Sequence, residues 1–173
     1  MKLEACKTYF GRGWILVLLA GVCYFFFHTD VHAASAAAAT IDDCQYADDN
    51  AARVAWEPMQ GSAPVSMALL DGRKVLRLAC NFEGTKTERA SWDRAVRLDL
   101  SSCRGVQFKV LCRDPSPVTY FSIYFQSGEG WYHGSFFPES SSGWNTIWIS
   151  KSATQTEGNP AGWGSVKIGR AHV

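Results

Sequence analysis

The chain of 173 residues lacks the sequence patterns that mark most enzymes and metal proteins. It has no phosphate-binding loop, no nucleophile elbow and no Cys-x-x-Cys spacing that would indicate zinc. Glycosidases use two carboxylates about 5 Å or about 6.5–9.5 Å apart. Asp93, Asp99, Glu129, Glu139 and Glu157 could supply them, but no spacing pairs them. The sequence therefore predicts a protein without a catalytic centre of its own.

An excess of charge of one sign is also absent. The formal net charge is +1, from 17 basic and 16 acidic residues. Such a balance indicates neither nucleic acid nor an acidic membrane surface as a partner. The length is that of one domain with a real core. Aromatic residues are plentiful, at 13% with seven Trp, which favours a bulky β core or an aromatic binding surface.

No helical periodicity is visible after the first 33 residues, whereas strand-like alternation recurs between turn signals. The Asp71-Gly72 pair predicts a tight hairpin. This pattern predicts an all-β fold, a two-sheet antiparallel β-sandwich of jelly-roll type. The expected strands cover residues 53–56, 65–70, 74–82, 92–100, 106–112 and 144–150, with a hairpin over 118–138. Residues 157–164 are expected to form a loop.

The N-terminus resembles a secretory signal peptide over residues 1–33. Basic residues precede an apolar run from Trp14 to Phe27, and Val31-His32-Ala33 fits a cleavage site. The run is shorter than the ~20 residues that span a bilayer, although an uncleaved anchor is the alternative. Residues 34–40 are a linker of small residues. We therefore expect a secreted, periplasmic or cell-surface protein with no membrane contact after cleavage.

Export would place four cysteines of the mature chain in an oxidising compartment. Cys103 and Cys112 flank one expected strand, roughly 30 Å apart, too far for a disulfide. If the third, fourth and fifth expected strands run antiparallel in turn, Cys80 and Cys112 lie at the same end. We therefore expect a Cys80–Cys112 disulfide.

The hairpin over residues 118–138 carries the clearest sign of a binding surface. With a four-residue turn at 127–130, Tyr124 lies opposite His133 and Gln126 opposite Trp131. One face is then apolar, and the other carries aromatic rings among polar groups. Such a face fits sugars, whose C–H faces stack on rings and whose hydroxyls need hydrogen bonds. The predicted ligand-binding residues are Tyr120, Tyr124, Gln126, Trp131, His133 and, from the next strand, Trp148.

The C-terminal hexapeptide, residues 168–173, is what a common short-read sequencing adapter encodes in one frame directly before a stop codon. This predicts that residues 168–173 are read-through and that the domain covers residues 41–167. The fold would then lack its last strand, and any domain encoded downstream would be missing. Asp42 and Asp43 at the domain entrance are candidate ligands of a structural calcium ion.

Several segments together resemble galactose-binding-like jelly-roll domains, including carbohydrate-binding modules of secreted bacterial glycoside hydrolases. They are Ile41-Asp42-Asp43, Leu76-Arg77-Leu78, Leu98-Asp99-Leu100, Gly105-Val106-Gln107-Phe108 and Trp144-Asn145-Thr146-Ile147. The resemblance implies a jelly roll, often with calcium, that binds polysaccharide or oligosaccharide beside a C-terminal catalytic domain. The sequence thus predicts a non-catalytic carbohydrate-binding accessory module. The alternative is a module that packs between domains and has no ligand.

Overall fold

The computed structural model describes residues 3–4, 40–80, 82 and 88–173. Strands in antiparallel sheets dominate, which confirms the predicted all-β class. One sheet has the order β2 (Thr40–Asp42), β1 (Leu3–Glu4), β7 (Gly105–Val110) and β9 (Asn145–Ser150). A larger sheet has the order β10 (Gln155–Pro160), β8 (Phe121–Phe136), β11 (Val166–His172), β6 (Ser91–Leu98) and β3 (Glu57–Met59).

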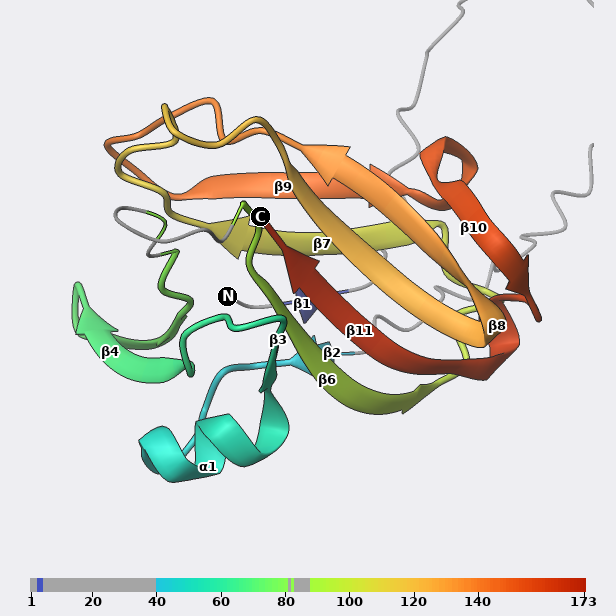
Figure 1. The fold of residues 1–173 in the computed structure, drawn as a ribbon, viewed down its shortest axis with the longest axis horizontal. Helices are drawn as coiled ribbons and strands as arrows, with labels where there is room; N and C mark the ends of the chain where they lie inside the picture. The colour runs from blue at the N-terminus through green and yellow to red at the C-terminus, as the bar shows by residue number, and fades with distance from the viewer. Residues whose placement is uncertain (1–2, 5–39, 81, 83–87) are drawn as a thin grey trace, which may run out of the picture.

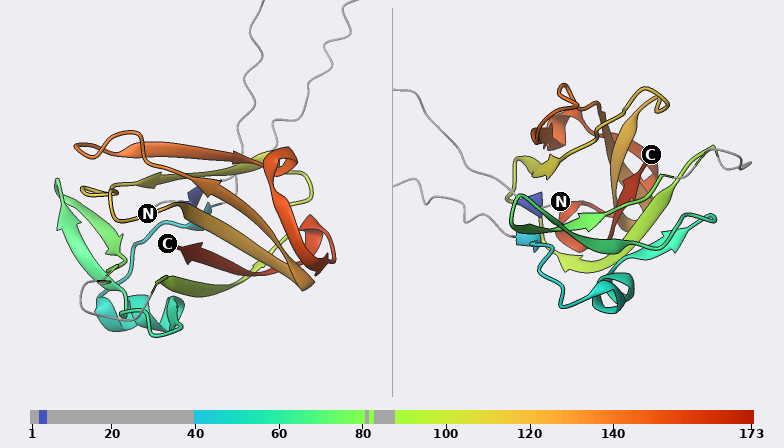
Figure 2. Two further views of the ribbon diagram at one scale, coloured as in Figure 1. Left: turned by 45° about the horizontal axis from the view of Figure 1, so that its top comes forward. Right: turned by 90° about the vertical axis from the view of Figure 1, so that its left-hand side faces the viewer.

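Among the described residues, the remaining elements are a hairpin and three short helices. The hairpin pairs β4 (Ser66–Leu70) with β5 (Arg73–Arg77). Figure 2 shows it at one end of the molecule with the helix α1 (Asp49–Ala55), and β10 at the other end. The 3₁₀ helices η1 (Lys151–Ala153) and η2 (Trp163–Ser165) flank β10 in the sequence. No helix among the described residues has the length and apolar character needed to cross a membrane.

Of two local predictions, a turn at Asp71-Gly72 and a strand over residues 53–56, one is confirmed and the other is wrong. The turn at Asp71-Gly72 is confirmed, with φ angles of 50° and 72°, because both positions of a type I′ turn are left-handed. The strand expected over residues 53–56 is wrong, since α1 occupies most of it. The Asp48 side chain caps this helix by accepting a hydrogen bond from the Ala51 amide. A capping signal therefore overrides the weak strand pattern.

The element β8 folds back on itself. Its Ser122 and Ser135 hydroxyl oxygens are 2.9 Å apart, and the rings of Tyr124 and His133 are 4.8 Å apart. A straight strand would hold these pairs tens of ångströms apart, at ~3.3 Å per residue. Its first half pairs with β11 and its second half with β10. The predicted hairpin and its register over residues 122–135 are therefore confirmed.

Side chains from the two larger sheets meet in one core. The Phe108 ring of β7 packs edge-on against Phe136 of β8, with centroids 4.9 Å apart. Trp56 and Trp92 are fully buried in the same cluster. The finer assignment to a jelly roll remains a prediction.

The strand β11 is the third of five in its sheet, and Figure 1 shows it between β8 and β6. It contains five of the six residues that the adapter match places outside the domain. Residues 168–172 therefore form part of this sheet, and the predicted loss of a last strand stays a prediction. Whether the gene itself encodes residues 168–173 remains a prediction for nucleotide sequencing. The predicted signal peptide lies outside the described residues, apart from Leu3 and Glu4 of β1.

β7 and β9 approach each other closely at Gly105. A Cβ atom on Gly105 would lie 2.4 Å from the Ile149 carbonyl oxygen, which is backbone and cannot rotate away. We expect Gly105→Ala to lower the free energy of unfolding by about 1–3 kcal/mol, as overpacking does elsewhere. Denaturant titration measures this change. The control is Gly143→Ala, where the nearest atom is a Ser140 hydroxyl 3.9 Å away, and equal effects of both changes would contradict the prediction.

Candidate functional site

The outward face of the five-stranded sheet gathers rings and polar groups, and we call it the polar-aromatic face. Alternation along β8 creates it, because Phe121, Ile123 and Phe125 are buried toward the core, whereas Tyr124 and Gln126, which point the other way, are half-buried. Neighbouring strands add three more side chains. The polar-aromatic face comprises Tyr120, Tyr124, Gln126, Trp131, His133, Glu157, Arg170 and His172.

The Tyr124 ring lies between rings from two neighbouring strands. On one side it stacks on His133, with an interplanar angle of 17°. The His172 ring of β11 lies 5.6 Å from it, centroid to centroid. Burial, with a smaller effect of Glu157, raises the pKa of the Tyr124 phenol. Tyr124 therefore presents its edge and a protonated hydroxyl to a ligand, rather than an open ring face.

The Trp131 ring has a guanidinium group over one face. The Arg170 Cζ atom lies 4.3 Å from the ring centroid, a cation–π contact. Two contacts hold Arg170 on Asp93 of β6, at 2.5 Å from Nε to Oδ1 and 2.8 Å from Nη2 to Oδ2. This bidentate contact raises the pKa of Arg170. Arg170 therefore covers one face of the half-buried Trp131 ring.

His133 and Glu157 bring an ionisable pair to the same face. His133 Nε2 lies 3.5 Å from Glu157 Oε1 across the β8–β10 pairing. The Glu157 side chain is 57% exposed, whereas that of His133 is 15% exposed. The exposed Glu157 carboxylate can accept a hydrogen bond from a ligand hydroxyl, and a His133 ring nitrogen can exchange one with it.

The structure brings together most, but not all, of the predicted binding residues. Tyr124, Gln126, Trp131 and His133 share the polar-aromatic face, and the half-exposed Tyr120 lies beside His172. Trp148 does not belong to this site, because its strand, β9, lies in the other sheet beside β7. Alternation along one strand gives the face of a residue but not the sheet that holds it.

Sequence reasoning missed Glu157, Arg170 and His172. Glu157 lies on β10, where five of six residues are exposed and no apolar alternation reveals a strand. Backbone pairing with β8 creates this strand, so the loop expected over residues 157–164 is wrong for its first part.

Asp42 is the centre of a buried hydrogen-bond cluster, which we call the Asp42 cluster. Its Oδ1 accepts from the Cys44 amide at 2.7 Å. Its Oδ2 accepts from Tyr46 at 2.5 Å and from the Trp56 indole at 2.7 Å, and Arg94 Nε lies 3.3 Å away. The side chain is 2% exposed. This carboxylate is therefore occupied by protein donors.

The predicted calcium site does not take shape around Asp42 and Asp43. The Asp43 carboxylate accepts from the Gln45 amide, in its own exposed turn. Calcium requires six to eight oxygen ligands. No group of three or more His, Cys, Asp or Glu residues that could hold a metal occurs within the described part of the chain. A structural calcium ion at Asp42 and Asp43 stays a prediction.

The predicted Cys80–Cys112 disulfide is wrong for this structure, in which both residues have free thiols. The premise behind it fails as well. The expected third, fourth and fifth strands do not run side by side, because β5, β6 and β7 belong to three different sheets.

The Cys80 thiol offers a test of its surroundings. Burial, and then the charge of Cys112, raises its pKa to about 11, although the residue as a whole is exposed. Since the thiolate is the nucleophile, we expect Cys80 to react with iodoacetamide about a hundredfold more slowly at pH 8 than in the unfolded chain. Its rate should rise tenfold per pH unit up to pH 10. Peptide mass spectrometry after timed labelling measures both, and a rate that levels off near pH 9 would contradict the burial.

No family model, curated protein or solved structure matches the chain.

Proposed function

We propose that the chain is a non-catalytic carbohydrate-binding accessory module of a secreted, glycan-degrading protein, with a jelly-roll fold. The observation that carries the proposal is the polar-aromatic face, where Tyr124, Trp131 and His133 lie together on one sheet. Sugars need apolar ring surface and hydrogen-bonding groups at once, and this face offers both.

Each group on the face has a distinct role in the proposal. Trp131 stacks on a pyranose through the ring face opposite Arg170. Tyr124 donates its hydroxyl, and Glu157 accepts from sugar hydroxyls. The Asp93–Arg170 pair keeps Trp131 in place, so little ordering remains to oppose binding.

Loss of Trp131 should remove most of the affinity for a polysaccharide. We expect Trp131→Ala to raise Kd at least about 30-fold, because buried aromatic anchors dominate binding energies. Affinity electrophoresis against xylan, mannan, galactan and β-glucan panels identifies the ligand, and calorimetry then measures Kd.

Trp148→Ala is the matched control, since Trp148 is equally aromatic and 46% exposed, but lies on the other sheet. Equal loss from both variants would place binding elsewhere. No polysaccharide bound by the folded chain would overturn the proposal and leave the alternative, a module that packs against a neighbouring domain.

A further inference from the structure

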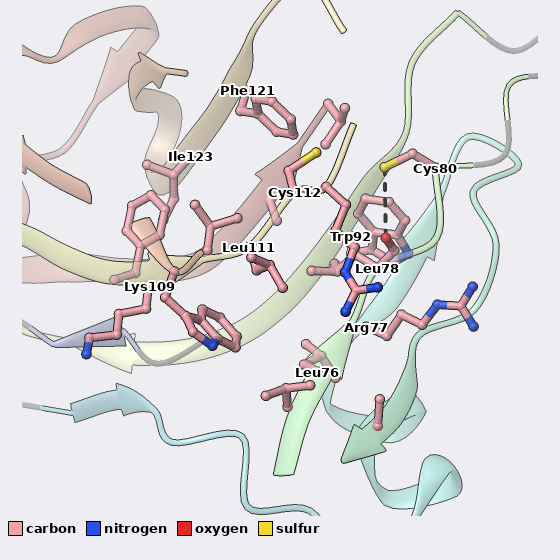
Figure 3. Close-up of a pocket in the computed structure, with 18 of the residues that line it drawn as sticks. Leu76, Arg77, Leu78, Cys80, Trp92, Lys109, Leu111, Cys112, Phe121 and Ile123 are labelled. Atoms are coloured by element: carbon pink, nitrogen blue, oxygen red, sulfur yellow. Dashed lines mark hydrogen bonds between the residues drawn. The ribbon is translucent and has the colours of Figure 1, made fainter. Parts of the chain in front are cut away.

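A second site lies beside the five-stranded sheet and shares only His172 with the polar-aromatic face among the described residues. A cavity of about 470 Å³ extends between the β4–β5 hairpin, the end of β7 and the start of β8. Figure 3 shows apolar side chains from several elements around it. Those labelled there are Leu76, Leu78, Trp92, Leu111, Phe121 and Ile123. Ligand pockets in proteins span about 300–1,000 Å³ and are lined in this way.

Among the described residues, the charged side chains that line the cavity are all basic. Arg77, Lys109 and Arg113 line it and are exposed to solvent, whereas no Asp or Glu among the described residues does. The chain as a whole carries nearly equal numbers of acids and bases, so composition does not explain this bias. None of the three cations forms an ion pair with another described residue. Their charge is therefore available to an anionic ligand.

An apolar side chain also stands at the end of the hairpin that borders the cavity. Leu69, close to the turn between β4 and β5, is 73% exposed and contributes to the cavity lining. An apolar chain entering from solvent would meet Leu69 before the buried residues.

We propose that this cavity binds a fatty acid, with the alkyl chain among the apolar side chains and the carboxylate near the cationic residues. At the ~30 Å³ that a water molecule occupies in the liquid, and with a methylene group of similar size, the volume suits roughly 10–16 carbon atoms. Arg77, Lys109 and Arg113 favour a carboxylate over a neutral or cationic head.

Calorimetry of the purified chain with monomeric saturated fatty acids tests the proposal. Each buried methylene contributes enough to change affinity about fourfold. We expect Kd to fall about fourfold per carbon from octanoate to dodecanoate. Dodecanol should bind more weakly than dodecanoate, and dodecyltrimethylammonium more weakly still. Equal binding of all three heads would overturn the role of the cations.

Variants locate the site. Cys112 presents its sulfur to the cavity (Figure 3), so Cys112→Phe should fill part of it and weaken dodecanoate binding at least tenfold. Ala95→Phe, on an exposed position of β6, is the size-matched control. The double change Lys109→Gln with Arg113→Gln should abolish the preference for carboxylate, whereas Arg97→Gln, at an exposed cation outside the lining, should not.

A thermal melt checks that each variant is folded. If Cys112→Phe does not fold, the double change Lys109→Gln with Arg113→Gln, at exposed positions, still tests the site. If neither Cys112→Phe nor the double change Lys109→Gln with Arg113→Gln alters dodecanoate binding, the fatty acid binds at another surface and the proposal is overturned. Trp131→Ala should leave fatty acid binding unchanged, so failure here and failure of the glycan proposal are distinguishable.

Discussion

Asp42→Ala should lower the free energy of unfolding by about 3–5 kcal/mol, the cost of removing one partner from a buried charge pair. The change leaves the Trp56 indole and the Tyr46 hydroxyl without their common acceptor, and Arg94 without its ion-pair partner. Of these, Trp56 is 1% exposed and has no access to water. Because a small domain is stable by only about 5–15 kcal/mol, this is a large share of the total. Guanidinium titration followed by Trp fluorescence measures it.

Asp43→Ala is the matched control for this prediction. Asp43 is the next residue and also a carboxylate, but it is exposed and accepts only within its own turn. Surface changes of this kind stay within about 0.5 kcal/mol. If Asp43→Ala costs as much as Asp42→Ala, the Asp42 cluster is not what holds the domain entrance against β6.

Removal of residues 168–173 is expected to have the largest effect of all. A chain that ends at Lys167 loses most of β11, and the facing edges of β8 and β6 lose their backbone partners. Each buried group left without a hydrogen bond costs about 1–3 kcal/mol. Several such losses exceed the stability of a typical domain. We expect no cooperative thermal transition by circular dichroism.

Arg170→Ala is the control that distinguishes the contribution of the β11 backbone from that of the Arg170 side chain. This variant keeps the strand and loses only the contacts with Asp93 and Trp131, so it should still unfold cooperatively. An unchanged melt for the chain ending at Lys167 would show that the sheet does not need β11. If sequencing of the gene replaces residues 168–173, we expect the encoded segment to be a strand with small side chains at the positions of Gly169 and Ala171. These positions face Phe125 and Ile123 of the core.

Short sequence patterns predicted the features that depend on neighbouring residues alone, namely the faces of a strand and the type of a turn. The alternation of Phe121, Ile123 and Phe125 with polar neighbours predicted the two faces of the first half of β8. The register of the second half followed only with a four-residue turn, since a one-residue slip would bury its polar set. The turn at Asp71-Gly72 was predictable for a similar reason, since few residue pairs tolerate two left-handed positions.

Sheet membership was not predictable from the sequence. Nothing within Trp144–Ser150 reveals that Trp148 lies beside β7 rather than β8, because that choice depends on packing between segments far apart in the chain. The Asp42 cluster joins residues from the start of the domain to Arg94, and an Asp-Asp pair alone reads equally well as a metal site. The cavity was invisible too, since the residues around it come from separate elements.

The position of β11 also constrains the order of events in biosynthesis. Asp93 and Arg170, which meet across β6 and β11, are 77 residues apart in the chain. Pairings of such high contact order form slowly, because a long loop must close before any contact compensates for its entropy. While a ribosome is still making β11, the edges of β6 and β8 that pair with β11 in the folded sheet have no partner. The nascent chain therefore stays open and exposed to chaperones until this strand emerges.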